Sequence, residues 1–145
     1  MKVVAQRVSH AAVRVDNELI AQIGEGLLLL VGFTHSDSEA NNLWMTSKLA
    51  NMRIFEDSKN KMNLSLLEKG GSVLVVSQFT LYADSRKGRR PAFVDAAEPG
   101  HAEGLFGQFC ELLADEGLKV EKGLFGAKMD VELVNDGPVT IILER

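Results

Sequence analysis

The feature that most constrains the fold is an uninterrupted apolar run at residues 26–33, GLLLLVGF. A strand with one solvent-facing side alternates apolar and polar residues, but this run is apolar on both faces. It therefore predicts a central strand in a sheet that is covered on both sides. The run is far shorter than the roughly 20 residues that a membrane-spanning helix needs. A second buried strand is expected within residues 72–82, where VLVV has the same character.

Alternating segments on either side of these runs predict further strands. Asp16-Asn17 is a hairpin-turn signal between strands expected at 11–15 and 18–23. The remaining strands are expected at residues 2–9, 53–55, 118–122, 128–134 and 139–143, with a weak element at 64–67.

Two helices are expected between the strands. Ser36 and Glu39 have the spacing of a capping box, which predicts a helix from there to about Met52. Pro99 and Gly117 suit the first position and the C-terminal end of a second helix. Because no repeat, low-complexity stretch or linker interrupts the chain, residues 1–145 are expected to form one domain. Its predicted class is a layered α+β fold with a mainly antiparallel or mixed sheet and two main helices.

Composition and charge narrow the class of protein. The net charge of −4 argues against sequence-blind nucleic-acid binding, which relies on many phosphate contacts. The single cysteine, Cys110, excludes an internal disulfide, as is usual in a reducing compartment. Charged residues also stand where a signal peptide would have its apolar centre. We therefore expect a soluble, cytoplasmic protein.

One short segment departs from this acidic balance. Arg86, Lys87, Arg89 and Arg90 place four cations within five residues. The segment is either a solvated basic loop or a clamp for phosphate groups on an otherwise acidic surface. As a clamp, it would favour one docking pose of a nucleic acid over sliding.

Few side chains are suited to covalent or metal chemistry. Ser77, Thr80 and Cys110 could act as nucleophiles, but each would need a base within hydrogen-bonding reach. The histidines occur in separate contexts and in no recognisable motif: His10, His35 and His101. No pair of His, Cys or Asp residues has the spacing of a zinc site, so no metal is expected. A threonine hydroxyl in a strand more often satisfies a neighbouring backbone group, and backbone N–H groups at a strand end could still stabilise an oxyanion.

Two short segments, one central and one near the C-terminus, are the most informative for function. Residues 77–82, SQFTLY, close the second buried strand, and residues 135–140, NDGPVT, interrupt two alternating strands. An Asp-Gly pair normally signals a tight hairpin. Here Pro138 removes a backbone donor where a returning strand would begin to pair. Gly137 followed by Pro138 therefore predicts a rigid corner.

Together these segments resemble the signatures of the D-aminoacyl-tRNA deacylase family, a Ser-Gln-Phe-Thr strand end and a Gly-Pro corner. Residues 123–129, GLFGAKM, lie just upstream of the corner and strengthen the match. The resemblance runs from residues 6–8 to residues 137–140, and the intact pair of segments favours the D-specific branch over a related animal family. Ala92 departs from the pattern, since relatives commonly have serine there.

The resemblance implies a homodimeric hydrolase that needs no cofactor. Its substrate would be the ester that joins a D-amino acid, or mischarged glycine, to the terminal adenosine of tRNA. Ser77, Gln78, Phe79 and Thr80 would line the catalytic pocket. Backbone groups near Phe79 and Thr80 would face the scissile carbonyl, and the ribose 2′-hydroxyl of the substrate would assist.

The same resemblance assigns roles elsewhere in the chain. Gly137 and Pro138 would reach across from the partner subunit and crowd the space that an L side chain must occupy. Arg7 would brace this corner, although a surface ion pair is the alternative interpretation. The adenosine pocket would be built by three residues whose alternative interpretation is ordinary core: Ala102, Phe125 and Met129. The tRNA phosphates would be met by the basic cluster: Arg86, Lys87, Arg89 and Arg90.

Two other classes of function stay open on the residues alone. One is a non-catalytic RNA-binding module, in which the basic loop is the function and the corner is only a dimer contact. The other is a hydrolase that uses Thr80 or Ser77 covalently on a small ester.

Overall fold

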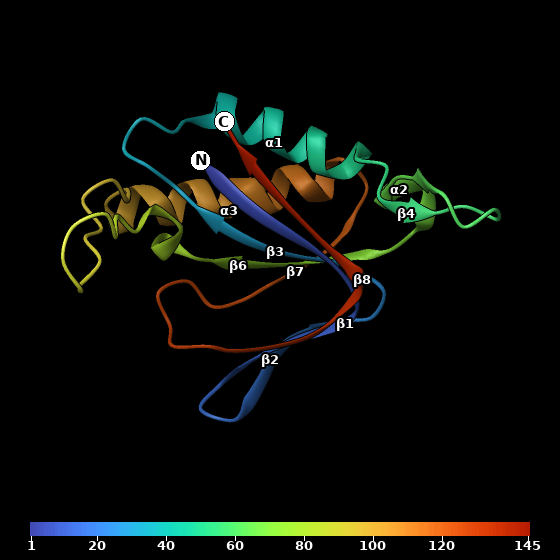
Figure 1. Ribbon diagram of the computed structural model, residues 1–145, viewed down its shortest axis with the longest axis horizontal. Helices are drawn as coiled ribbons and strands as arrows, with labels where there is room; N and C mark the ends of the chain where they lie inside the picture. The colour runs from blue at the N-terminus through green and yellow to red at the C-terminus, as the bar shows by residue number, and fades with distance from the viewer.

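In the computed structural model, which describes residues 1–145, two long helices lie side by side on one face of a strongly curved sheet (Figure 1). The helices are α1 (Glu39–Asn51), the short α2 (Leu66–Lys69) and α3 (Pro99–Asp115), with a 3₁₀ helix, η1, at Phe79–Tyr82. The strands are β1 (Lys2–Val15), β2 (Glu18–Ile23), β3 (Gly26–Gly32), β4 (Phe55–Glu56), β5 (Met62–Leu64), β6 (Ser72–Ser77), β7 (Lys119–Lys122) and β8 (Asp130–Glu144). The predicted α+β class is confirmed. None of the helices combines the length and the apolar character needed to cross a membrane.

The long strand β1 organises the sheet, whose order is β2-β1-β3-β6-β7 with β8 on the other edge of β1. The first half of β1 pairs with β3 and the second half with β2, whereas β8 follows β1 through both halves. These pairs are antiparallel, and β3, β6 and β7 are parallel to one another. Because β2 and β3 share one edge of β1, the sheet curls into a nearly barrel-like shape (Figure 1).

The curled sheet has a hydrophobic core on each face. Leu27, Leu29 and Val31 of β3 belong to a core of 23 buried residues beneath α1 and α3. Leu28, from the opposite face of β3, belongs to a second core of 8 buried residues, which the ends of β1 and β2 enclose. The prediction of a central strand covered on both sides is therefore confirmed. The Asp16-Asn17 turn is confirmed as well, since both residues have the positive φ that a tight hairpin requires.

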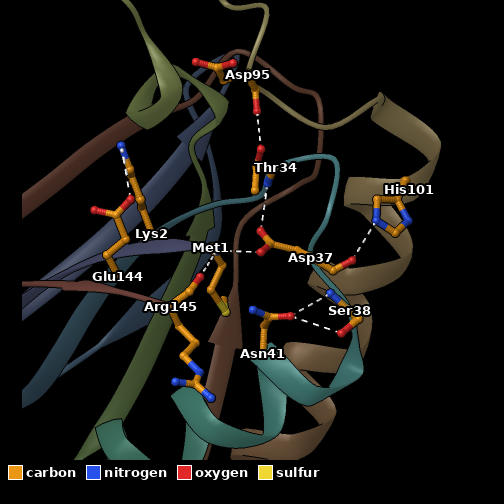
Figure 2. Close-up of polar contacts among 10 residues, drawn as sticks. All are labelled: Met1, Lys2, Thr34, Asp37, Ser38, Asn41, Asp95, His101, Glu144 and Arg145. Carbon is orange, nitrogen blue, oxygen red and sulfur yellow. Dashed lines mark hydrogen bonds and ion pairs between the residues drawn. The ribbon is translucent and has the colours of Figure 1, made fainter.

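The start of α1 differs from the prediction. The helix begins at Glu39 with Ser38 as its N-cap, and the N–H of Ser38 donates to Asn41 Oδ1 at 3.0 Å, so the box at Ser36 and Glu39 is wrong. The reason lies in Asp37, whose side chain is buried. It accepts from the α-ammonium group of Met1 at 2.6 Å and from Thr34 N at 2.8 Å (Figure 2). These long-range bonds hold the preceding residues in a non-helical turn.

Strand boundaries also differ from the prediction. Strand β6 lies within the predicted range 72–82 but ends at Ser77, where the chain turns into η1. The two predicted C-terminal strands are one strand, β8, and the two predicted N-terminal strands are one strand, β1. The weak element at 64–67 becomes helix α2, capped by a box between Ser65 and Glu68. Pairing to a continuous partner explains the merging, because β1 and β8 each hold the other extended.

We expect the buried ion pair between Met1 and Asp37 to be a major source of stability. Asp37→Ala removes the side-chain carboxylate that pairs with the buried ammonium group, leaves only the Arg145 oxygen at 2.6 Å as its acceptor, and should lower the free energy of unfolding by about 3–5 kcal/mol. Urea unfolding followed by circular dichroism measures this loss. Glu111→Ala is the matched control, since Glu111 is exposed on α3 and should change the value by less than about 0.5 kcal/mol. Equal losses in the two variants would contradict the prediction.

Candidate active site

A pocket of about 580 Å³ opens where β6 ends, and 12 of its 17 lining residues are hydrophobic. The parallel strands β3 and β6 end together here, and the carboxyl edge of parallel strands is a common place for a ligand site. Ser77, Gln78 and Phe79 line the pocket. The predicted adenosine-binding residues line it too: Ala102, Phe125 and Met129. Thr80, the second residue of η1, does not line it.

The end of β6 presents backbone donors to this region. Gln78 N donates to Val31 O at 2.7 Å, which is the last bond that ties the segment to β3. The amide groups of Phe79 and Thr80 follow at the start of η1, where the first N–H groups of a helix have no acceptor inside it. Neither amide has a backbone acceptor elsewhere. The strand end can therefore offer N–H groups to a negatively charged oxygen.

No arrangement for nucleophilic catalysis surrounds Thr80 or Ser77. The hydroxyl of Thr80 accepts a hydrogen bond from Gln78 Nε2 and has no base beside it. The histidines bond elsewhere: His10 lies 3.8 Å from Glu132, His35 donates to Val94 O and His101 donates to Asp37 O. Cys110 is buried in the α3 core, and this burial raises the pKa of its thiol to about 11.

The Gly-Pro corner is a three-residue excursion from β8. Gln6 pairs with Thr140 and Val8 with Asn135, so two steps along β1 correspond to five along β8, which leaves three extra residues. The Gly137-Pro138 peptide bond is cis. Asn135 closes the excursion, since its Oδ1 accepts from Val139 N at 2.7 Å and its Nδ2 donates to Val139 O at 3.1 Å. The chain thus leaves the ladder and returns without reversing direction, which differs from a hairpin.

Arg7 lies behind the corner and is 3% exposed. The alternative interpretation of Arg7 as part of a surface ion pair is therefore wrong. Its Nε donates to Asp136 O at 3.0 Å and its Nη1 donates to Ile54 O at 2.7 Å. The carboxylates of Asp136 and Glu56 lie 3.2 and 3.7 Å from the guanidinium group. One buried side chain therefore ties the corner to the segment before β4.

Within one chain the corner and the pocket lie apart. The register places Thr140 beside Gln6, Gln6 beside Leu28 and Leu28 beside Leu74. Phe79 is five residues beyond Leu74, which corresponds to about 16 Å along the strands. Neither Gly137 nor Pro138 lines the pocket, and both are exposed.

The basic segment forms an exposed loop whose base is closed by hydrogen bonds between Asp84 and Ala92 at 2.8 and 2.9 Å. Arg86 folds back onto Asp84 with two side-chain bonds of 2.8 Å, and this pairing lowers the pKa of Asp84 to about 2. Arg86 is therefore already engaged. The other three cations have no acidic partner: Lys87, Arg89 and Arg90.

Comparisons with known proteins place the chain in a family and agree with its fold. A family model described as D-Tyr-tRNA(Tyr) deacylase matches residues 4–144. A D-aminoacyl-tRNA deacylase of Thermomicrobium roseum is 59% identical over 99% of this chain and 94% of its own length. One from Brevibacillus brevis is 56% identical over 99% of both chains.

Two solved structures share the fold. One, described as c-Myc DNA Unwinding Element Binding Protein, is 41% identical with a TM-score of 0.93 and covers 100% of this chain and 99% of its own. Another, a probable eukaryotic D-amino acid tRNA deacylase, has a TM-score of 0.86 over 98% of this chain and 97% of its own. At 18% identity this second likeness concerns the fold alone.

The chain belongs to the D-Tyr-tRNA(Tyr) deacylase family. The family expected from the sequence is thereby confirmed, and with it the class of enzyme, a hydrolase of aminoacyl-tRNA esters.

Sequence reasoning missed the residues that complete the pocket between η1 and α3. Phe93, Ala96, Ala97 and Glu98 line it, and the ring of Phe93 meets that of Phe79 edge-on with centroids 5.1 Å apart. Three of these residues are apolar, Glu98 stands in no recognisable motif, and the four follow no periodic pattern. The one available signal was their place between the basic cluster and the proline that opens α3.

We expect Gly137 to tolerate no side chain. Its φ is +138°, and an added Cβ would lie 2.7 Å from Val139 Cγ2 and 2.9 Å from Val139 N. Gly137→Ala should therefore lower the free energy of unfolding by about 1–3 kcal/mol, measured by urea unfolding. Gly104→Ala in α3 is the control: nothing lies within 4 Å of its added Cβ, and alanine favours a helix by up to about 1 kcal/mol. Undiminished stability of Gly137→Ala would be the contrary result.

Proposed function

We propose that this enzyme hydrolyses the ester between a D-amino acid, or glycine, and the 3′-terminal adenosine of tRNA, and that it spares L-aminoacyl-tRNA. The observation that carries the proposal is the shared pocket. Ser77, Gln78 and Phe79 line the same cavity as Ala102, Phe125 and Met129. A volume of about 580 Å³ is within the usual range for a small-ligand site. Charged tRNA is used in the cytoplasm, which agrees with the location expected from the sequence.

The proposed chemistry depends on position and backbone dipoles. An aminoacyl ester is already activated, and the neighbouring ribose 2′-hydroxyl can assist from within the substrate. The amide groups of Phe79 and Thr80 would stabilise the developing oxyanion. A covalent role for Thr80 has little support, because its hydroxyl accepts from Gln78 and hydrogen-bonds to no carboxylate or imidazole that could take its proton.

A second copy of the chain would complete the pocket. The corner lies beyond Thr140, which is itself about 16 Å along the strands from Phe79 of its own chain, so a Gly-Pro wall for this pocket must come from a partner. Two features support a homodimer. The corner is exposed, and the outer edge of the 15-residue strand β8 has no neighbouring strand. An exposed edge of this length invites pairing with another chain, and Val134 and Ile142 on β8 are exposed apolar residues.

In this arrangement the corner would select by exclusion. Its carbonyl groups would occupy the space of an L side chain and leave room for hydrogen or a D side chain. Arg7 and Asn135 hold the corner from behind, which gives the wall the stiffness that exclusion needs. A glycine ester would be accepted, because glycine has no side chain to clash with the carbonyl groups of the corner.

The decisive experiment is deacylation of one tRNA charged in parallel with the D and the L form of the same amino acid. We expect rapid loss of the D ester and no acceleration of the L ester above the uncatalysed rate. Binding of tRNA without loss of either ester would favour the RNA-binding module. Equal cleavage of both esters would contradict the role of the corner.

We expect the substrate hydroxyl to matter more than Thr80. Thr80→Ala should keep kcat within about tenfold of the parent, because it removes no reacting group. A 2′-deoxyadenosine terminus should reduce the rate much further. Single-turnover deacylation of D-charged tRNA compares the two changes. Removal of a true nucleophile costs several orders of magnitude, so such a loss in Thr80→Ala would favour the covalent mechanism.

We expect the basic loop to contribute affinity. Replacing Arg89 and Arg90 with alanine should raise KM for charged tRNA and reduce the salt dependence of log KM by about one unit for each phosphate that is no longer neutralised. The value of kcat should change little. The matched control replaces Lys48 and Lys59, two exposed cations away from the pocket, and removes the same charge. Identical salt slopes for both double variants would mean that tRNA docks elsewhere.

A further inference from the structure

One wall of the pocket is attached to the sheet mainly through side chains. This wall, residues 93–97, links the basic loop to α3 and forms no strand. Its backbone meets the end of β3 only at an isolated bridge between Ala96 and Thr34, to which the bond from Ala97 N to Phe33 O at 2.9 Å belongs. Because this backbone pairing is so limited, the position of the wall depends on side-chain contacts.

The side chains of two adjacent residues make these contacts: Thr34 and His35, in the connection from β3 to α1. Thr34 Oγ1 donates to Asp95 O at 2.6 Å (Figure 2), and His35 Nε2 donates to Val94 O at 2.7 Å. Both bonds end on carbonyl groups of the wall. They fix the orientation of consecutive peptide units, and this decides which side chains of the wall turn toward the cavity.

Thr34 is itself anchored from behind. Its N–H donates to Asp37 Oδ2 at 2.8 Å, and Asp37 Oδ1 accepts from the Met1 ammonium group (Figure 2). The carbonyl of Asp37 accepts from His101 Nε2 at 3.0 Å, and His101 precedes the pocket residue Ala102 on α3. The wall and the start of α3 are thus both tied to one residue, Asp37, whose carboxylate is buried.

We propose that Thr34 and His35 are positioning residues for the 3′-terminal nucleoside of the substrate, and this proposal rests on the function proposed above. Phe93 and Ala96 of the wall face the pocket, and Phe93 packs against Phe79. The wall continues directly into the turn of α3 that carries Ala102. A displaced wall would therefore weaken binding of the nucleoside, while the Phe79 and Thr80 amide groups stay in place on β6 and η1.

The test compares three variants with the parent in steady-state deacylation of D-charged tRNA. Thr34→Val keeps the shape of the side chain and removes the hydroxyl, and it should raise KM about threefold to tenfold with kcat within twofold. Thr34→Ser keeps the hydroxyl and should return KM to within twofold of the parent. His35→Leu should raise KM in the same way as Thr34→Val.

Thr46→Val is the matched control for a purely structural effect. Thr46 is buried on α1 away from the pocket, and its Oγ1 donates to Asn42 O at 2.9 Å, so this change should reduce stability and leave KM unchanged. Urea unfolding of every variant shows that KM is compared between folded proteins.

The outcomes separate the two proposals. If the parent cleaves D-charged tRNA and Thr34→Val has the parental KM, the positioning role is overturned and the function stands. A fall in kcat alone, or a failure of Thr34→Ser to restore KM, also overturns the positioning role. A parent protein that does not cleave the D ester overturns both proposals.

Discussion

The rest of the structure depends on the pairing of β1. This one strand holds β8 along its whole length on one edge and divides its other edge between β3 and β2. The division forces the sheet to curl, and the curl creates the second core beneath β3 and β6. The same pairing directs β3 and β6 toward one edge, where both end and the pocket opens. The position of the pocket therefore follows from how β1 is shared among its partners.

Arg7 shows how the same strand also holds the corner. It lies between Gln6 and Val8, at the step where β8 leaves the ladder. Burying a guanidinium group is costly unless its donors are satisfied, and here two backbone carbonyls and two carboxylates surround it. Because these acceptors belong to the corner and to the segment around β4, the arginine cannot be satisfied unless both are in place. Burial of one charge thus couples two segments far apart in the sequence.

The sequence predicted the elements whose conformation depends on the local pattern and chemistry of their residues. Apolar runs on both faces identified β3 and β6, and two residues able to adopt positive φ identified the hairpin after β1. Prediction from the sequence failed where an element boundary depends on a contact with a residue far away in the chain. The start of α1 depends on Asp37 bonding to Met1, 36 residues away, which no local pattern contains. In the candidate site, all of the predicted strand end except Thr80 shares one pocket with the predicted nucleoside residues. Residues 93–97 were missed because they act through backbone carbonyls and apolar surface.

The contrast between the two boundaries of the proposed pocket has a physical consequence. The corner is held by a buried arginine and by Asn135, which bond to the backbone of Asp136 and Val139 on either side of the Gly-Pro pair. Steric exclusion by a fixed wall discriminates between the two configurations at the α-carbon of the substrate amino acid. It does not discriminate between different side chains, because it needs no favourable contact with them. The opposite wall, at residues 93–97, is attached by two side-chain hydrogen bonds and by little backbone pairing. We therefore expect the Gly-Pro corner to determine selectivity between D and L substrates, and the wall at residues 93–97 to determine affinity for the nucleoside. Changes at Thr34 should then alter KM for D substrates without allowing cleavage of L substrates.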